Sequence, residues 1–296
     1  IQNGCDKLCT FCAVPYTRGR EVSRPSTDIL DEVGRLVGLG YNSITLLGQN
    51  VNSYGIDRPG EQSFAELLDD VAELCESSGR TIWVYYTSPH PQDMSTDVLE
   101  TMASRPALAK QVHLPLQSGD DKILIRMNRN YHLDRYRAIV EEIRSIIPTA
   151  TLSTDIIVGF TGETDEQFEQ TRLAMKEFDF NMAYIAAYSP RPGAASARWA
   201  DDVPVAVKKN RVQVLSEELR RSAGVYNAAM IGTIVQVLVE GSARRSGYLT
   251  GRTEGRVIVR FPERSDITTG SIVPVQITRA ASLSVEGELA QAPVVG

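Results

Sequence analysis

The feature that most constrains the fold is a repeated alternation of short strand-like runs and amphipathic helical segments up to about residue 222. In each helical segment apolar residues recur every three or four positions, as Tyr136, Ile139 and Ile143 do. Alternation repeated this often predicts a parallel sheet covered by helices, either a full or partial barrel or a doubly wound sheet. The predicted strands are 43–47, 81–86, 111–114, 152–158 and 182–188, and the predicted helices are 28–37, 64–76, 96–103, 133–147 and 165–178.

Two of these helices carry start signals. Ser63 precedes the helix at 64–76, and Glu66 stands three residues later, which is the pattern of a capping box. Ser95 precedes the helix at 96–103, whose first turn holds Asp97. We therefore expect both serines to be helix N-caps.

The pattern changes in the last quarter of the chain. A long helix at 205–221 leads into alternating apolar runs at 232–240, 256–261 and 272–277, with glycines between them. This arrangement predicts a small antiparallel β-barrel of about 65 to 70 residues. We expect a first domain at 1–222, the barrel domain at 223–290 and a disordered tail at 291–296.

Composition and charge exclude several classes of protein. The chain has 296 residues, of which 42% are hydrophobic and 23% charged, so it can bury a large core. No apolar run approaches the roughly 18 to 20 residues that span a bilayer, and the first residues do not resemble a cleavable signal. The net charge of −6 argues against a generic polyanion binder.

Three of the four cysteines lie on one short loop. Cys5, Cys9 and Cys12 have the spacing C-x3-C-x2-C, whereas Cys75 stands alone in a helical pattern and is interpreted as a small core residue. A structural zinc site needs four ligands, and the three histidines do not share the loop (His90, His113 and His132). Three thiolates suit a four-iron cluster with one open iron, with a zinc knuckle completed from elsewhere as the alternative. His113, on an apolar strand, is interpreted as a hydrogen-bonded core residue.

The loop resembles the cluster motif of radical S-adenosylmethionine (radical SAM) enzymes, C-x3-C-x-aromatic-C, with Phe11 as the aromatic residue. Five further blocks occur in the order found in the methylthiotransferases of that superfamily. They most resemble the MiaB type, which adds a methylthio group to C2 of N6-isopentenyladenosine at position 37 of tRNA. The blocks are 13–21, 46–52, 113–119, 155–160 and 188–193, and the resemblance extends from residue 1 to about residue 290.

The resemblance implies a fold and a chemistry. It implies a partial (β/α)6 radical SAM barrel followed by a TRAM domain, an RNA-binding β-barrel. It also implies a [4Fe–4S] cluster on Cys5, Cys9 and Cys12 whose open iron binds SAM and whose electron cleaves SAM to a 5′-deoxyadenosyl radical. That radical would take hydrogen from the adenine, and sulfur bearing a methyl group would replace it, with two SAM molecules used. The unpaired bases of an anticodon loop make the base easy to reach.

Candidate cofactor-binding residues come from the matched blocks, several of which follow predicted strands. A glycine there lets a ligand approach the backbone, and side-chain amides supply fixed donors and acceptors, although an ordinary turn would explain each block by itself. The candidates are Phe11, Gly48, Gln49, Asn50, Gln117, Ser118, Gly159, Tyr188 and Arg191. No catalytic residue is assigned beyond the cluster.

Positive charge gathers toward the end of the chain. Residues 208–264 hold 11 Lys or Arg and 5 Asp or Glu, although the whole chain is negative. Segregated positive charge is what phosphate contacts need, with a solvated charged face as the alternative. The candidate RNA-binding residues are Arg244, Arg245, Arg252 and Arg256.

The sequence departs from the family in one large respect. Family members carry a preceding domain whose three cysteines hold a second four-iron cluster, and we expect the natural protein to be longer than this chain. The chain alone should cleave SAM without complete methylthiotransferase activity. Smaller departures are Thr161, where the family usually has proline, and Ala194, where it usually has threonine.

The expected partners are a tRNA anticodon stem-loop and an electron donor such as flavodoxin or ferredoxin, for a cytoplasmic monomer that binds no membrane. One alternative is a sister enzyme acting on threonylcarbamoyl-adenosine in tRNA or on an aspartate of a ribosomal protein. The blocks at 48–52 and 113–119 favour the isopentenyladenosine type. A second alternative, of another class, is a non-catalytic RNA-binding module with a structural metal.

Overall fold

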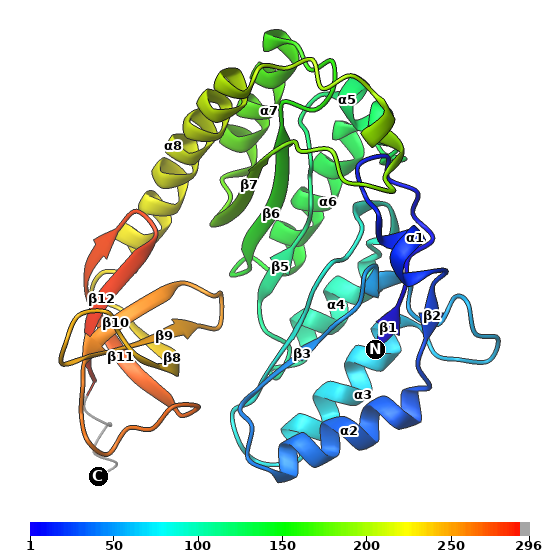
Figure 1. Cartoon of the computed structure of the whole chain (residues 1–296). Helices are drawn as coiled ribbons and strands as arrows, with labels where there is room; N and C mark the ends of the chain where they lie inside the picture. Colours follow the sequence, from blue (N-terminus) through cyan, green and yellow to red (C-terminus); the bar gives the residue numbers. More distant parts are fainter. Residues whose placement is uncertain (291–296) are drawn as a thin grey trace.

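The computed structural model describes residues 1–290, so the expected tail at 291–296 lies outside the described residues. Its first part is a curved layer of parallel strands with helices on the outer side (Figure 1). The strands are β3 (Ser43–Leu46), β4 (Trp83–Tyr86), β5 (Gln111–His113), β6 (Thr151–Val158) and β7 (Met182–Ala187). Each begins within two residues of its predicted start.

The parallel strands form two sheets. β3 pairs with β4, with Ser43 opposite Trp83, and β5, β6 and β7 form a three-stranded sheet. A single parallel bridge between Val84 and Leu108 lies between the sheets. The first part of the chain therefore has five parallel strands, β3 to β7. The N-terminal amine of Ile1 donates to the Leu47 carbonyl (2.9 Å), beside the end of β3.

The helices of this layer match the predicted amphipathic segments closely. They are α2 (Ser26–Gly38), α3 (Phe64–Glu76), α4 (Thr96–Ser104), α6 (Leu133–Ile146) and α7 (Asp165–Phe178). Several short elements were not predicted. They are β1 (Gln2–Asn3), α1 (Val14–Arg18), β2 (Val22–Ser23), α5 (Asp121–Arg126) and the 3-10 turns at Val51–Ser53, Pro91–Asp93 and Ala195–Arg198. Such short elements contain too few residues for a period to show.

The structure confirms the predicted core and both predicted helix starts. Tyr136, Ile139 and Ile143 are buried, and Cys75 is 0% exposed, as a core residue should be. Ser63 forms the full capping box with Glu66. Ser95 is the N-cap residue of α4, as predicted, although its side chain makes no cap hydrogen bond.

The second part of the chain is a closed five-stranded barrel reached through one long helix, α8 (Val205–Ala229). The strands are β8 (Ile234–Ser242), β9 (Tyr248–Thr253), β10 (Ile258–Pro262), β11 (Ile272–Ala281) and β12 (Ser284–Leu289). Neighbouring strands are antiparallel, except that β10 and β12 pair in parallel to close the barrel.

α8 runs eight residues past its predicted end because its last turns contact both parts of the molecule. The Ser222 hydroxyl donates to the Phe180 carbonyl (3.0 Å), and the Asn227 side chain donates to the Ala281 carbonyl (3.0 Å). Packing on two sides removes the single apolar face by which an amphipathic helix is recognised. Within residues 1–290, no helix is long and apolar enough to cross a membrane.

Candidate functional site

The cysteine loop is held in place by the short β1–β2 pair and its neighbours. Gly4 has a φ of +79°, and a Cβ there would lie 2.0 Å from the Arg20 carbonyl oxygen, so this position requires glycine. The Cys5 N–H donates to the Gly19 carbonyl (3.3 Å). The Arg20 guanidinium donates twice to the Asp6 carboxylate (2.7 and 2.8 Å) and holds the pKa of that carboxyl below its usual range.

The three loop thiols line one cavity of about 210 Å³. Each sulfur accepts one hydrogen bond: Cys5 from the Lys7 N–H (3.4 Å), Cys12 from the Val14 N–H (3.5 Å), and Cys9 from the Arg129 guanidinium (3.4 Å). Hydrogen bonds to the sulfurs are the contacts that stabilise metal-bound thiolates.

This donor set fits an iron–sulfur cluster. Cys5 and Cys9 are buried and Cys12 is half-buried, and burial raises the pKa of Cys5 to about 11 and also raises that of Cys12. Metal binding must therefore displace protons from these thiols. Within residues 1–290, no three His, Cys, Asp or Glu side chains are arranged to share a single metal ion. A four-iron cluster does not require that arrangement, because each cysteine binds a different iron.

The rest of the cavity is lined mainly by residues that follow the carboxyl ends of parallel strands, where ligand sites of such sheets lie. Gln49 and Asn50 follow β3, and the Gln49 side chain accepts from the Gly4 N–H (2.6 Å). His90 follows β4, and burial lowers its pKa to about 2, so the imidazole is neutral. Asn50 Oδ1 and His90 Nε2 are buried and have no hydrogen-bond partner in the described part of the chain.

A larger cavity of about 570 Å³ adjoins the first, and both are lined by Phe11, Cys12, Gln117 and Asp155. Its other wall is β7 together with Tyr188 and the exposed Arg191. Tyr188 is fixed there because its hydroxyl hydrogen-bonds the Ser196 hydroxyl (2.8 Å) and its ring packs on Phe160. Gln117 has a φ of +69°, an unusual backbone conformation at the junction of the two cavities.

Three of the predicted cofactor-binding residues lie outside both cavities. A Cβ at Gly48 would meet Val51 at 2.9 Å, so this glycine is required by packing inside the protein. Ser118 is fully buried, with its hydroxyl 3.3 Å from that of Thr171 on α7. Gly159 has a φ of +67°, and a Cβ there would meet Lys208 at 2.4 Å. Each of these residues therefore packs against the protein itself, and its predicted ligand contact stays a prediction.

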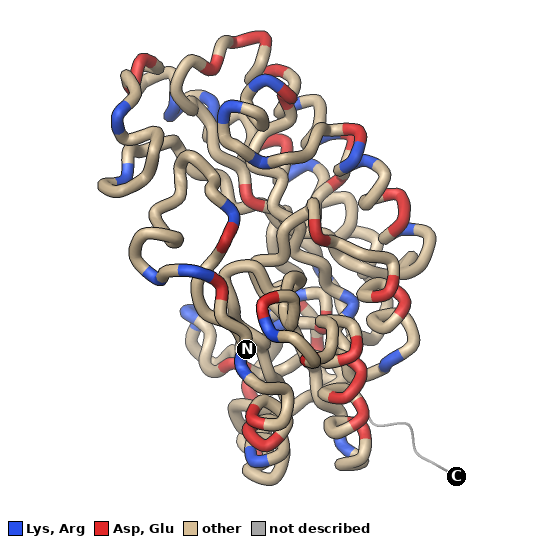
Figure 2. The backbone as a smooth tube through the Cα atoms, turned by 90° about the vertical axis from the view of Figure 1, so that its right-hand side faces the viewer, with Lys and Arg blue, Asp and Glu red and all other residues tan. Residues whose placement is uncertain are grey.

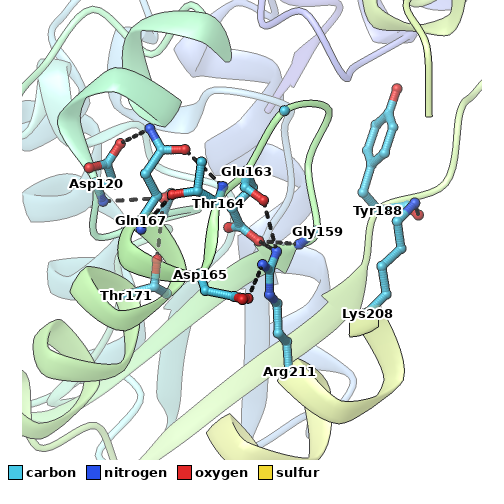
Figure 3. Close-up of polar contacts among 12 residues, drawn as sticks. Asp120, Gly159, Glu163, Thr164, Asp165, Gln167, Thr171, Tyr188, Lys208 and Arg211 are labelled. Atoms are coloured by element: carbon cyan, nitrogen blue, oxygen red, sulfur yellow. Dashed lines mark hydrogen bonds and ion pairs between the residues drawn. The ribbon is translucent and has the colours of Figure 1, made fainter. Parts of the chain in front are cut away.

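The Gly159 turn is filled by the protein's own carboxylate (Figure 3). Glu163 Oε2 accepts from the Gly159 N–H (2.5 Å) and pairs with the Arg211 guanidinium (2.6 Å). The Lys208 ammonium donates to the Tyr188 carbonyl (3.1 Å) from the other side. This turn supports the wall of the larger cavity from behind.

The four predicted RNA-binding arginines fall into two pairs. Arg244 and Arg245 are exposed between β8 and β9, with the Arg245 guanidinium 4.0 Å from the centre of the Tyr248 ring. Arg252 and Arg256 are half-buried and line a third cavity, of about 200 Å³, between the barrel and the β5–β7 sheet. Positive and negative residues are interspersed on the face shown in Figure 2.

Sequence reasoning missed Arg129 and the role of His90. The fragment Asn128-Arg129-Asn130 has no helical or strand period, and an isolated arginine gives no sign that it is buried. Asparagine tolerates the left-handed backbone conformation, so the two asparagines that flank Arg129 were the available sign of an unusual backbone conformation at this position. His90 was noted only as a histidine outside the loop, and the fold brings it beside the cysteines.

The comparisons with known proteins agree with this geometry. Residues 1–174 match the radical SAM superfamily, and residues 228–290 match the TRAM domain. Among solved structures, the radical S-adenosylmethionine methyltransferase TsrM from Kitasatospora setae superposes with a TM-score of 0.54 at 15% identity, over 66% of this chain and 35% of that one. Coproporphyrinogen III oxidase from Escherichia coli gives 0.52 at 13% identity, over 84% and 64%. Both show the same fold.

Curated relatives are much closer in sequence. A protein named tRNA-2-methylthio-N(6)-dimethylallyladenosine synthase from Nitrosomonas eutropha is 40% identical over 98% of this chain and 65% of its own length. Proteins of the same name from Clostridium botulinum (strain Okra) and Symbiobacterium thermophilum are 43% and 42% identical, over 97% and 99% of this chain and 63% of their own lengths. The chain thus spans less than two thirds of these relatives.

The match to the superfamily covers more than half of the chain, and it includes the three-cysteine loop and the parallel strands β3 to β6. That superfamily binds a [4Fe–4S] cluster together with SAM. The chain belongs to the radical SAM superfamily.

Proposed function

We propose that the full-length protein is a tRNA methylthiotransferase that modifies C2 of N6-isopentenyladenosine (also called dimethylallyladenosine) at position 37. The observation that carries this proposal is the 40 to 43% identity, over nearly all of this chain, to proteins named for that activity. Because the chain spans only part of those relatives, the activity is assigned to the whole protein. Of the steps of that activity, we assign SAM cleavage and RNA binding to this chain.

In this proposal Cys5, Cys9 and Cys12 hold the cluster, and SAM binds beside it. The bound pair supplies one-electron chemistry that removes hydrogen from an unreactive carbon. The free Asn50 Oδ1 and His90 Nε2 orient polar groups of the cofactor at the cavity wall, since buried polar atoms need partners. Gln49 keeps the loop in register with β3 through its bond to Gly4.

The adjoining cavity along β7 is the proposed site of the substrate base. Its volume of about 570 Å³ lies within the range of small-molecule sites, and it shares Cys12 and Gln117 with the cluster cavity. Tyr188 supplies a fixed aromatic wall, and the exposed Arg191 can meet a phosphate at the entrance. A base that has left its stack would sit between them.

RNA binding is assigned to the barrel, with Arg244 and Arg245 as phosphate contacts on its free surface. The second cluster is proposed to lie outside this chain, because Cys75 is a lone buried cysteine. We also propose that a flavodoxin or ferredoxin supplies the electron, and that the protein works as a monomer in the cytoplasm, where its tRNA substrate is found.

Anaerobic reconstitution of the cluster tests the SAM cleavage that we assign to this chain. The chain should take up about four iron and four sulfide and form 5′-deoxyadenosine from SAM under a strong reductant. Cys9→Ala should abolish both results, because one of three thiolates is lost. Binding of zinc without iron would instead support the non-catalytic module with a structural metal.

A second experiment tests the substrate. Transfer RNA from a strain that lacks the full-length gene is analysed by nucleoside mass spectrometry. Loss of 2-methylthio-N6-isopentenyladenosine is the expected result. Unchanged levels of that nucleoside would contradict the proposal, and loss of the methylthio form of threonylcarbamoyl-adenosine would assign the protein to the sister enzymes.

A further inference from the structure

We propose that Arg129 is a positioning residue for the cluster, a buried cation that balances the negative charge of the thiolates and raises the reduction potential. This inference rests on the proposed binding of the cluster by Cys9. It adds a role for a residue that lies outside the three-cysteine motif.

The contacts of Arg129 place its charge against the cluster loop. Its side chain is almost fully buried, and Nη1 donates to Cys9 Sγ at 3.4 Å. Nη2 donates to the Pro115 carbonyl (3.3 Å), and Nε donates to the Tyr131 hydroxyl (3.3 Å). The guanidinium also lies 5.3 Å from the centre of the Tyr131 ring. These contacts fix the guanidinium in one orientation, in which Nη1 faces Cys9 Sγ.

No carboxylate balances this charge within residues 1–290. Asp155 lines the same cavity, with its carboxylate 3.3 Å from His113 Nε2, and the Asp93 carboxylate pairs with Lys7 (2.8 Å). Neither acid forms an ion pair with Arg129 in the described part of the chain. A buried cation without a counterion is costly to desolvate. Cysteine thiols are neutral, but cluster-bound thiolates are anionic, so the missing counterion is supplied when the cluster binds.

The backbone around Arg129 is built to hold it. Asn128 and Asn130, on either side of Arg129, both have a positive φ, 56° and 55°, a left-handed conformation that asparagine tolerates. The same segment clamps the cluster loop, since the Asn128 side chain donates to the Leu8 carbonyl (2.8 Å) and the Thr10 N–H donates to the Met127 carbonyl (3.0 Å). The arginine and the cysteine are therefore fixed relative to each other.

The electrostatic consequence has a definite sign. Reduction adds one negative charge to the cluster, and a nearby cation favours that state, as does a hydrogen bond to sulfur. Replacing Arg129 by methionine, which has a similar length and no charge, should lower the equilibrium constant for reduction at least tenfold. For a one-electron step this equals a shift of about 59 mV to more negative potential.

The experiment compares four reconstituted chains: wild type, Arg129→Met, Arg129→Lys and the control Arg126→Met. Arg126 lies three residues earlier and is exposed, with its guanidinium over Trp199 and away from the cysteines. Iron content, the electron paramagnetic resonance spectrum and the midpoint potential are measured for each. Melting temperatures are measured with and without cluster.

The proposal expects the potential to fall in the order wild type, Arg129→Lys, Arg129→Met, with Arg126→Met equal to wild type. It also expects the cluster-free Arg129→Met chain to melt no lower than the cluster-free wild type, because the variant lacks the unbalanced cation. The increase in melting temperature on cluster binding should be smaller for Arg129→Met than for wild type. Loss of iron from Arg129→Met but not from Arg129→Lys supports the same role.

Two results would overturn the proposal. One is an unchanged potential in Arg129→Met with full iron content. The other is a cluster-free Arg129→Met chain that is unfolded or melts well below wild type, because the arginine would then serve the fold alone. A wild-type chain that takes up no iron would instead refute the proposed function, so the two failures are distinguishable.

Discussion

The ion pair between Arg211 and Glu163 illustrates how single residues fix the walls of the site. Its side chains are 4% and 0% exposed, and the carboxylate also accepts from the Gly159 N–H (Figure 3). Gly159 in this turn is one of the predicted cofactor-binding residues. In the structure the Glu163 side chain occupies the turn, and no sequence pattern indicates which of the two nearby carboxylates, Glu163 or Asp165, points inward.

Replacing Glu163 by alanine should therefore destabilise the chain strongly. The substitution leaves Arg211 buried with only the exposed Asp165 as its partner, and breaking a buried pair costs about 3 to 5 kcal/mol. Urea unfolding measures the loss. Glu166→Ala, three residues later and exposed, is the control and should cost less than about 1 kcal/mol. Equal losses in the two variants would contradict this account.

The fourth cysteine allows a prediction about the chemistry of single thiols. Cys75 is fully buried, and burial raises the pKa of its thiol to about 11. Because the thiolate is the reactive form, iodoacetamide at pH 8 should label Cys75 only after the chain unfolds. Cys75→Ala should keep the full iron content and should cost about 1 kcal/mol of stability. A loss of iron in that variant would make Cys75 part of the metal site.

Site residues that share a local sequence motif could be predicted, whereas those brought together by the fold could not. The cysteine spacing is local, so the loop could be predicted, and the structure brings Phe11, Gln49, Asn50 and Gln117 to the same cavity. Arg129 contacts Cys9 across 120 positions, a separation that no local pattern encodes.

Among the secondary-structure elements, those with a full period were predicted within a few residues, and those shaped by contacts were not. Strands β9 and β12 were missed, and each contains a glycine that the barrel requires. A Cβ at Gly251 would lie 2.2 Å from the Leu238 carbonyl oxygen, and one at Gly287 would lie 2.3 Å from that of Gln276. Glycine lowers the apparent strand propensity at the positions where the closed barrel needs close approach.

The two helix starts provide a matched test at this scale. Ser63 caps α3 through its side chain, whereas Ser95 stands in the same position before α4 without a cap bond. Ser63→Ala should lower the free energy of unfolding by about 1 kcal/mol, because a helix N–H loses its partner. Ser95→Ala should cost less than about 0.5 kcal/mol. Denaturant titration of both variants decides the matter, and a larger loss for Ser95→Ala would show that the cap assignment is wrong.

For the whole molecule, the important feature is the joint between the barrel and the parallel sheets. The turn at residues 254–256 reaches across it. The Tyr85 hydroxyl donates to the Glu254 carbonyl (3.0 Å), the Lys110 N–H donates to the Glu254 carboxylate (2.8 Å), and the Thr151 hydroxyl donates to the Gly255 carbonyl (3.0 Å). The Arg256 guanidinium lies 4.0 Å from the centre of the Tyr85 ring. The joint thus holds the barrel against the sheets whose strand ends line the cluster cavity.

Arg256 and Arg244 carry the same charge on the same barrel, so exchanging each for alanine separates two roles. Arg244 is exposed, and its loss should weaken binding of an anticodon stem-loop and lower the salt slope by about one. Arg256 covers Tyr85, and such a cation–π contact is worth about 0.5 to 2 kcal/mol. Arg256→Ala should therefore loosen the joint, seen as a larger radius of gyration in X-ray scattering and faster proteolysis after α8.

SAM cleavage without RNA should be unchanged in both variants, because neither residue lines the cluster cavity. If Arg256→Ala kept the wild-type radius and lowered the salt slope as Arg244→Ala does, Arg256 would be a phosphate contact. The joint would then depend on its other contacts, such as those of Glu254 and Gly255.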